Sequence, residues 1–146
     1  MRRARGFTLL EMLLVLALGV AIYAILLSIP FGKASAADLK AAAREVASEL
    51  RTAQSTAMAT RRDAVLTLDM DSREMIATGE REARRLPSNI DLKLYTAQTE
   101  VASDRRGSIR FYPDGSSTGG RVTVMSGERK YLVDVDWLTG RVAINE

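Results

Sequence analysis

The chain has 146 residues, a formal net charge of +3 at neutral pH, and neither cysteine nor histidine. This length allows one small domain with a short additional segment, and the absence of cysteine excludes disulfide bonds. The absence of histidine removes the commonest metal ligand and the usual general base, so the composition argues against an enzyme.

A short basic leader opens the chain, and a long apolar segment follows it. Three arginines stand among the first five residues, whereas Glu11 is the only charged side chain in residues 7–31. About 25 residues of helix span roughly 37 Å at 1.5 Å per residue, enough to cross a hydrocarbon core of about 30 Å. The arginines place the leader on the cytoplasmic side. The sequence therefore predicts one transmembrane helix over residues 7–31.

Glu11 is costly in this segment, because a carboxylate within a membrane raises the insertion free energy and usually marks a functional pairing. The run Gly6-Phe7-Thr8-Leu9-Leu10-Glu11 resembles the class III signal of type IV prepilins and type II secretion pseudopilins. The resemblance implies that a prepilin peptidase cuts between Gly6 and Phe7 and methylates the new amino terminus on Phe7. It also implies that Glu11 is the assembly carboxylate, which meets the amine of an axially shifted neighbour. The alternative is a plain single-pass anchor in which Glu11 has no role.

The expected cut also changes the charge of the protein. It removes three of the 21 basic residues and leaves 18, against 18 acidic residues. The mature protein is then formally neutral in its side chains, so its composition does not indicate nucleic-acid binding.

Pro30 and Gly32 interrupt the apolar helix near its outer end, and Pro30 predicts a kink there. Residues 32–60 then show an amphipathic pattern, with Glu45 and Glu49 among the charged residues off the apolar stripe. We expect a helical rod from Phe7 to about residue 60, whose second half packs on a sheet of its own domain rather than in an intermolecular coiled coil. The stripe consists of Leu39, Ala43, Val46, Leu50, Ala53 and Ala57.

After residue 60 the apolar period changes to two, which is typical of strands. Turn-forming residues separate the strands, so we expect mostly antiparallel sheets or a small sandwich. Residues 79–85 are expected to form a loop, and the polar residues 96–107 a flexible insertion. The predicted strands are 64–70, 73–77, 91–95, 108–112, 121–125, 130–136 and 141–144.

The glycine-rich run Pro113-Asp114-Gly115-Ser116-Ser117-Thr118-Gly119-Gly120 superficially resembles a phosphate loop. A Walker-type loop needs a lysine after the glycines and a helix behind it, whereas here Arg121 and a predicted strand follow. A hairpin turn between the strands around Ile109 and Val122 explains the glycines without a ligand.

Asp134 and Asp136 share one face of a predicted strand, and alternation places them in solvent. The other face carries Val133, Val135 and Trp137. Paired carboxylates can bind calcium, but calcium needs about six to eight oxygen ligands. Asp114 is the only further acid with a reason to join them, so we predict no metal site and no cofactor.

Residues 109–120 and 133–142 resemble the H-type minor pseudopilins of type II secretion, which share a carboxy-terminal domain with T-type minor pilins. The resemblance implies an α+β, pilin-like fold. In such a fold a long N-terminal helix, transmembrane in its first half and amphipathic in its second, packs on a small, mostly antiparallel sheet or sandwich. The expected parts are a cleaved leader (1–6), a transmembrane and filament-core helix (7–31), an amphipathic helix (32–60) and a β-rich periplasmic domain (61–146).

The function that this resemblance implies is structural: a subunit of the periplasmic pseudopilus. Its expected partners are the prepilin peptidase, other major and minor pseudopilins, and the inner-membrane assembly platform. We expect a single-pass protein of the inner membrane of a Gram-negative bacterium, with the C-terminal domain in the periplasm.

Two alternatives remain. One is a minor pilin of a type IV pilus, involved in pilus assembly or DNA uptake. Each arginine cluster of the chain has an acid beside it, and residues 140–146 hold only one arginine, so nucleic-acid binding is not expected. The other alternative is an anchored periplasmic enzyme, for which the sequence contains no recognisable constellation of residues.

Overall fold

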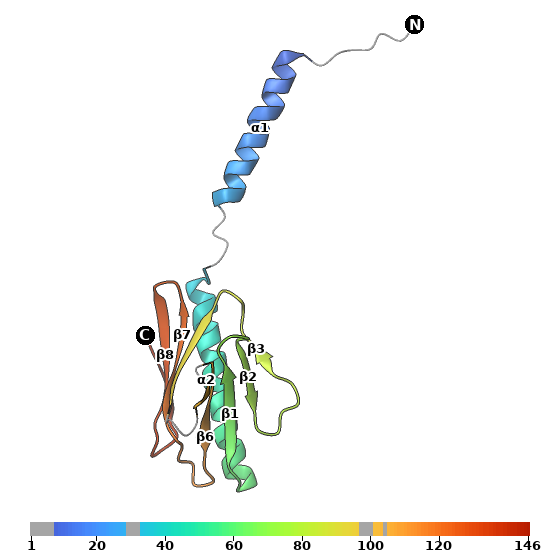
Figure 1. Cartoon of the computed structure of the whole chain (residues 1–146). Helices are drawn as coiled ribbons and strands as arrows, with labels where there is room; N and C mark the ends of the chain where they lie inside the picture. The colour runs from blue at the N-terminus through green and yellow to red at the C-terminus, as the bar shows by residue number, and fades with distance from the viewer. Residues whose placement is uncertain (1–7, 29–32, 97–100, 104) are drawn as a thin grey trace. The chain divides into compact units, whose positions relative to one another are not determined.

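The computed structural model describes residues 8–28, 33–96, 101–103 and 105–146 (Figure 1). The chain divides into two compact units, residues 1–32 and residues 33–146. In the first unit, α1 (Leu9–Ser28) is apolar around its whole circumference, and its described side chains are exposed. Among the described residues, no helix combines the length and the apolar character needed to cross a membrane. Gly6, Phe7 and Pro30 lie outside the described residues, so the cleavage site and the kink stay predictions.

The second helix, α2 (Ala36–Thr60), begins at a capping box. The Ser35 side chain accepts from the Asp38 amide at 3.1 Å, and the Asp38 carboxylate accepts from the Ser35 amide at 3.2 Å. Such reciprocal bonds satisfy backbone donors that a helix start leaves free. Lys33–Ser35 are not helical, so the expected continuous rod is interrupted before α2. The apolar periodicity is compatible with a continuous or an interrupted helix. The capping residues Ser35 and Asp38 show that a separate helix begins here.

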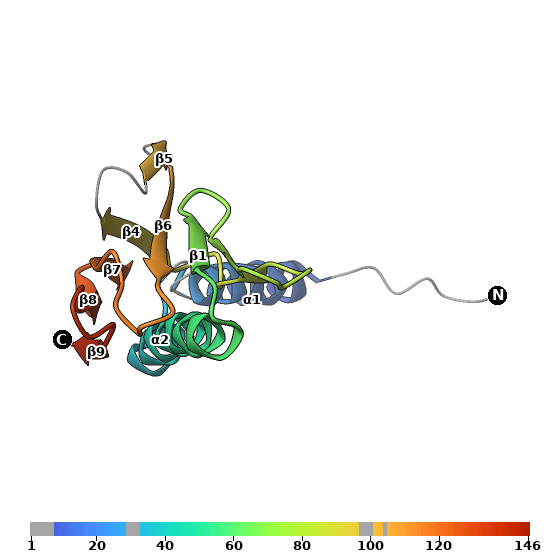
Figure 2. The same ribbon diagram turned by 90° about the horizontal axis from the view of Figure 1, so that it is seen from below.

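Within the described residues, nine strands form two antiparallel sheets. Sheet A has the order β3-β2-β1-β6-β5, and sheet B has the order β4-β7-β8-β9. In Figure 2 the two sheets diverge, and α2 lies against both. The strands are β1 (Ala64–Asp69), β2 (Glu74–Ala77), β3 (Arg84–Arg85), β4 (Asp91–Thr96), β5 (Val101–Ser103), β6 (Arg106–Phe111), β7 (Gly120–Ser126), β8 (Arg129–Val135) and β9 (Val142–Asn145).

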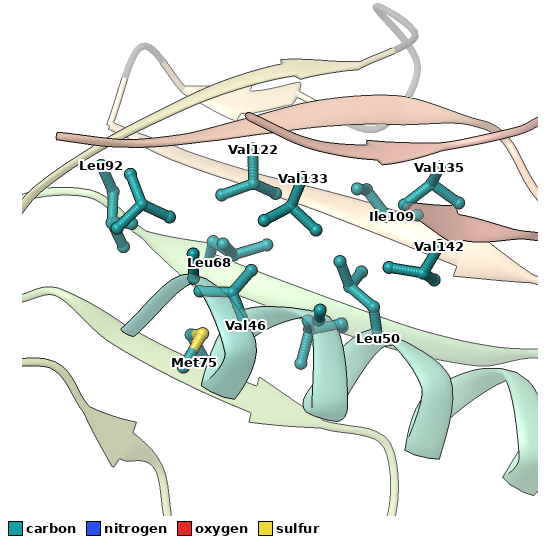
Figure 3. Close-up of a cluster of buried hydrophobic side chains, with 14 of the residues drawn as sticks. Val46, Leu50, Leu68, Met75, Leu92, Ile109, Val122, Val133, Val135 and Val142 are labelled. Carbon is teal, nitrogen blue, oxygen red and sulfur yellow. The ribbon is translucent and has the colours of Figure 1, made fainter. Parts of the chain in front are cut away.

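One hydrophobic core joins α2 to both sheets. All six residues of the predicted apolar stripe on α2 are buried. In Figure 3, Val46 and Leu50 of α2 point toward Leu68 of sheet A and Val133 of sheet B. Burying a side chain of this size contributes about 1.5–3 kcal/mol. The expectation that the second helix packs on its own domain is therefore confirmed, as is the α+β class.

Two short strands lie where the sequence predicted loops. β3 falls within the expected loop 79–85, and β5 falls within the expected insertion 96–107. β3 is polar and pairs only with β2, where Arg85 lies opposite Glu74 and forms an ion pair with it. Neither segment shows the apolar alternation that indicates the other strands, and both residues of the edge strand β3 are exposed.

Glu49 corrects the predicted surface of α2. The side chain was placed off the apolar stripe, yet the residue is 7% exposed. Its Oε1 lies 2.8 Å from Nε of Arg84 on β3. The pKa of Glu49 is raised above 4.5 mainly by burial, and the positive charge of Arg84 opposes part of this rise. Arg84 of β3 thus contacts a side of α2 that helical periodicity assigned to solvent.

Replacing Glu49 by glutamine is expected to stabilise the domain at neutral pH, because the variant buries no carboxylate charge and burial raises the pKa of Glu49 despite its ion pair with Arg84. Because the native state holds the Glu49 proton more tightly than the unfolded chain does, wild-type stability falls as pH rises from 4.5 through the raised pKa. The glutamine variant avoids that loss, and the half-exposed Arg84 can be hydrated instead. Urea unfolding at pH 7 and pH 4 should show the difference at pH 7 only. Glu45→Gln is the control at a less buried site; a destabilised Glu49→Gln variant at pH 7 would mean that the ion pair outweighs burial.

The start of α2 is attached to sheet B. The Ala34 amide donates to Ser126 Oγ at 2.8 Å, and Ser126 Oγ donates to the Asn89 carbonyl at 2.8 Å. Ala34 and Ser126 are both buried. Three segments far apart in the sequence therefore meet where the second unit begins.

Candidate functional site

Glu11 lies in the first turn of α1. Its amide donates to the Thr8 carbonyl at 3.1 Å, and its side chain is exposed. A carboxylate in the first helical turn also interacts favourably with the helix dipole, by about 0.3–1 kcal/mol. The exposed Glu11 side chain is therefore available to a partner. Its favourable interaction with the dipole of its own helix is a second reason for an acid at this position.

The predicted glycine-rich turn begins directly after β6. The Gly115 amide donates to the Tyr112 carbonyl, and the Tyr112 amide donates to the Ser116 carbonyl, both at 2.9 Å. Gly115 has φ +88°, as expected for a three-residue hairpin loop that ends in a left-handed residue. Asp114 accepts bonds from the Ser116 hydroxyl and amide, which lower the pKa of its carboxyl group.

This turn does not connect two paired strands, which corrects the prediction of a hairpin between Ile109 and Val122. β6 belongs to sheet A and β7 to sheet B, so the segment carries the chain from one sheet to the other. The local reversal is real, since Phe111 forms an isolated bridge with Ser117. Turn residues alone could not reveal which sheet the next strand joins.

Gly119 and Gly120 are required by the close approach of neighbouring chain segments. Gly119 has φ +70°, and a Cβ there would lie 2.9 Å from Cβ of Trp137. Gly120 has φ +151°, and a Cβ there would lie 2.8 Å from the carbonyl oxygen of Tyr95. Without side chains at Gly119 and Gly120, this segment can pass between β4 and the β8–β9 loop. The two glycines therefore have a structural role that does not require a bound phosphate.

Asp136 organises the β8–β9 loop. Its Oδ1 accepts from the amides of Leu138 and Thr139 at 3.1 and 2.8 Å, and from the Thr139 hydroxyl at 2.8 Å. The bonds from Thr139 lower the pKa of the Asp136 carboxyl group. The Trp137 carbonyl accepts from the Ser117 amide at 2.9 Å. The two loops therefore form one bonded unit.

Gln54 of α2 holds both loops and was missed by the sequence analysis. Its Nε2 donates to the Gly115 carbonyl at 2.9 Å and to the Thr139 carbonyl at 3.1 Å. Its position in the sequence could have indicated this role. Gln54 lies four residues after Leu50 and three before Ala57, beside the apolar stripe. A polar side chain there can reach across the helix–sheet boundary.

Apolar side chains are exposed around these loops. Trp137 is 66% exposed, Leu138 63% and Tyr95 80%. Trp137 was expected on the inner face with Val133 and Val135, which are indeed buried. β8 ends at Val135, so the alternation stops before Trp137 and its side chain leaves the core. The loops thus present large apolar side chains on a bonded scaffold, a composition typical of protein contacts.

The paired aspartates have separate partners. Asp134 forms an ion pair with Arg121 and accepts from Asn145 Nδ2 at 2.9 Å. The bond from Arg121 lowers the pKa of the Asp134 carboxyl group. Asp136 serves the loop described above, and Asp114 bonds to Ser116. In the described part of the chain, no three His, Cys, Asp or Glu residues lie close enough to hold a metal ion.

Two family descriptions match the chain. The family described as type II transport protein GspH matches residues 42–139, and the prokaryotic N-terminal methylation motif matches residues 1–28. One curated relative is type II secretion system protein H of Xanthomonas campestris pv. campestris. It is 33% identical over 142 residues, which are 97% of this chain and 83% of the relative.

Two solved structures have a similar fold. The type IV minor pilin FimU of Pseudomonas aeruginosa is similar with a TM-score of 0.59 and 13% identity, over 74% of this chain and 88% of that chain. The minor pseudopilin EpsH from the type 2 secretion system of Vibrio cholerae is similar with a TM-score of 0.56 and 13% identity, over 74% and 96%. At this identity the likeness concerns the fold alone.

Proposed function

The chain belongs to the GspH family of type II transport proteins, and we propose from this premise how it is processed, anchored and assembled. It is a minor pseudopilin, a structural subunit of type II protein secretion. The observation that carries this function is the presence of two signatures at opposite ends of one chain. The methylation motif covers residues 1–28, and the GspH match covers the loops that Gln54 holds together.

The proposed processing is a cut between Gly6 and Phe7 by a prepilin peptidase, followed by methylation of the Phe7 amine. The match to the methylation motif supports this step. Residues 7–31 then form the membrane anchor and filament-core helix, and the domain beyond residue 32 lies in the periplasm. The apolar surface of α1 around its whole circumference suits such burial.

The proposed assembly contact joins Glu11 of one subunit to the Phe7 amine of the next. An amine and a carboxylate buried together fix the relative position of two helices more than they add stability. The proposed partners are other major and minor pseudopilins and the inner-membrane assembly platform. The exposed loop residues Trp137 and Leu138 are available for contacts in the periplasm.

Blocking the cleavage site tests the processing. A Gly6→Val variant is expected to keep its six-residue leader and an unmethylated Met1, because the peptidase must fit the backbone on both sides of the scissile bond. Mass spectrometry of membrane-extracted protein measures this directly. Gly19→Ala is the matched control, since a Cβ at Gly19 has open space around it. Detection of the normal mature mass for Gly6→Val would overturn the assigned cut.

Deletion of the gene tests the function as a whole. We expect a known exoenzyme to accumulate in the periplasm and to reach the medium again when the gene is restored. Normal export from the deletion strain would contradict a role in secretion. Assembly of a type IV pilus and DNA uptake would then be the functions to measure.

A further inference from the structure

β9 forms one edge of sheet B, and its register shows which of its backbone groups are paired. Val142 lies opposite Val135, and Ile144 lies opposite Val133. The Asp136 amide donates to the Arg141 carbonyl at 3.0 Å, in the same register. Because bonded and non-bonded pairs alternate in antiparallel strands, Ala143 and Asn145 bond to β8, while Val142 and Ile144 turn their backbone groups outward.

The outward groups are only partly used. The Val142 carbonyl accepts from Arg51 Nη2 at 3.1 Å, which confirms its direction. The amide and carbonyl of Ile144 have no hydrogen-bond partner within residues 33–96, 101–103 and 105–146. Ile144 is half-buried rather than enclosed. An unpaired strand edge of this kind is a template for one more strand.

A row of α2 side chains borders this edge, and Figure 2 shows β9 as the strand beside α2. Arg44, Ser48 and Arg51 are spaced by four and three residues and are all exposed, so they lie on one side of the helix. Arg51 reaches Val142 at the start of β9. Arg44 lies near its other end, close to Tyr131, whose hydroxyl donates to Glu146 Oε1 at 3.1 Å.

We propose that this edge binds an extended peptide segment with alternating carboxylates, which adds a strand beside β9 and pairs with Arg44 and Arg51. The backbone positions of Arg44 and Arg51 lie about 10 Å apart along the helix, and alternate residues of a strand lie about 7 Å apart, so carboxylates on one strand face can reach both long side chains. Main-chain bonds to Ile144 supply the register, and the arginines select acidic side chains. The inference does not depend on the anchor or on Glu11.

The test uses the full chain in detergent micelles and a labelled short peptide of alternating glutamate and threonine. Fluorescence anisotropy measures binding, and amide hydrogen exchange followed by NMR locates it. In the free protein, the Ala143 and Asn145 amides should exchange slowly and the Ile144 amide quickly. Peptide binding should slow exchange at Ile144.

Two controls separate strand addition from charge attraction. The same peptide with every backbone nitrogen methylated keeps its charge but has no N–H donors, and it should bind at least about tenfold more weakly. An Arg44→Gln, Arg51→Gln variant should also lose about tenfold in affinity. Arg61→Gln, Arg62→Gln, at the other end of α2, removes the same charge and should bind as the wild type does.

Three results would overturn the proposal. Equal binding of the methylated peptide would show that the peptide binds by charge attraction and not by strand addition. Unchanged exchange at Ile144 would place the peptide elsewhere. Tighter binding of duplex DNA than of the peptide, lost in the Arg44→Gln, Arg51→Gln variant, would make the row a phosphate-binding surface instead.

Discussion

A Glu11→Val variant is expected to remain cleaved and membrane-associated but to lose incorporation into the filament, so that exoenzyme release falls to the level of the deletion strain. Removing one partner of a buried ion pair costs about 3–5 kcal/mol, because the other charge stays buried without compensation. A cost of this size corresponds to an association weakened by about two to three and a half orders of magnitude. Chemical crosslinking to other pseudopilins and the exoenzyme activity of the medium measure both effects.

Two controls separate this pairing from the local role of Glu11 at the start of α1. Met12→Val changes the adjacent residue without removing a charge and should be tolerated. Glu11→Gln keeps a polar side chain but not the charge, and should fail as the valine variant does. Normal secretion by the valine variant would leave the helix dipole as the only reason for an acid at this position.

Gly140→Ala is expected to destabilise the domain by about 2–4 kcal/mol. Gly140 has φ +62°, and a Cβ there would overlap the Gly115 carbonyl oxygen and the Gln54 amide. The backbone strain costs about 1–2 kcal/mol. The overlap costs more, because it separates the two loops that Gln54 joins. Urea unfolding gives the change in free energy.

Gly79→Ala is the matched control for backbone strain alone. Gly79 has φ +92°, and a Cβ there meets nothing within 4 Å. This variant should lose only about 1 kcal/mol. Equal losses for the two variants would show that the loop contact of Gly140 carries no additional energy.

The apolar pattern predicted the parts of the fold that bury side chains in regular periods. The stripe from Leu39 to Ala57 and the alternation of Leu66 and Leu68 are both buried as expected. The apolar pattern did not predict a strand that buries few side chains, nor a charged side chain that is buried in an ion pair. β3 is two exposed arginines, and Glu49 is buried through its ion pair with one of them. Such features depend on which segments meet, and local periodicity contains no information about that.

The sequence predicted the glycine-rich turn of the candidate site but not the contacts that this turn makes. The glycine-rich turn from Pro113 to Gly120 was identified as structural, and the positions of Gly119 and Gly120 support that interpretation. Its passage between two sheets, its attachment to Gln54 and the exposure of Trp137 were not foreseen. The attachment to Gln54 depends on contacts between residues far apart in the sequence, and the passage between sheets depends on which strands pair, whereas turn preferences concern immediate neighbours.

The bond between Ala34 and Ser126 also decides how the domain meets mechanical load. A pulling force on the chain before Lys33 acts on the domain at a point that β7 already holds through this bond, not at a free helix end. To extract α2 along its own axis, a pulling force must break that bond and displace the buried stripe from both sheets. Unwinding a free helix end one turn after another would need far less force. The domain is therefore built to resist unravelling from its N-terminal end under tension.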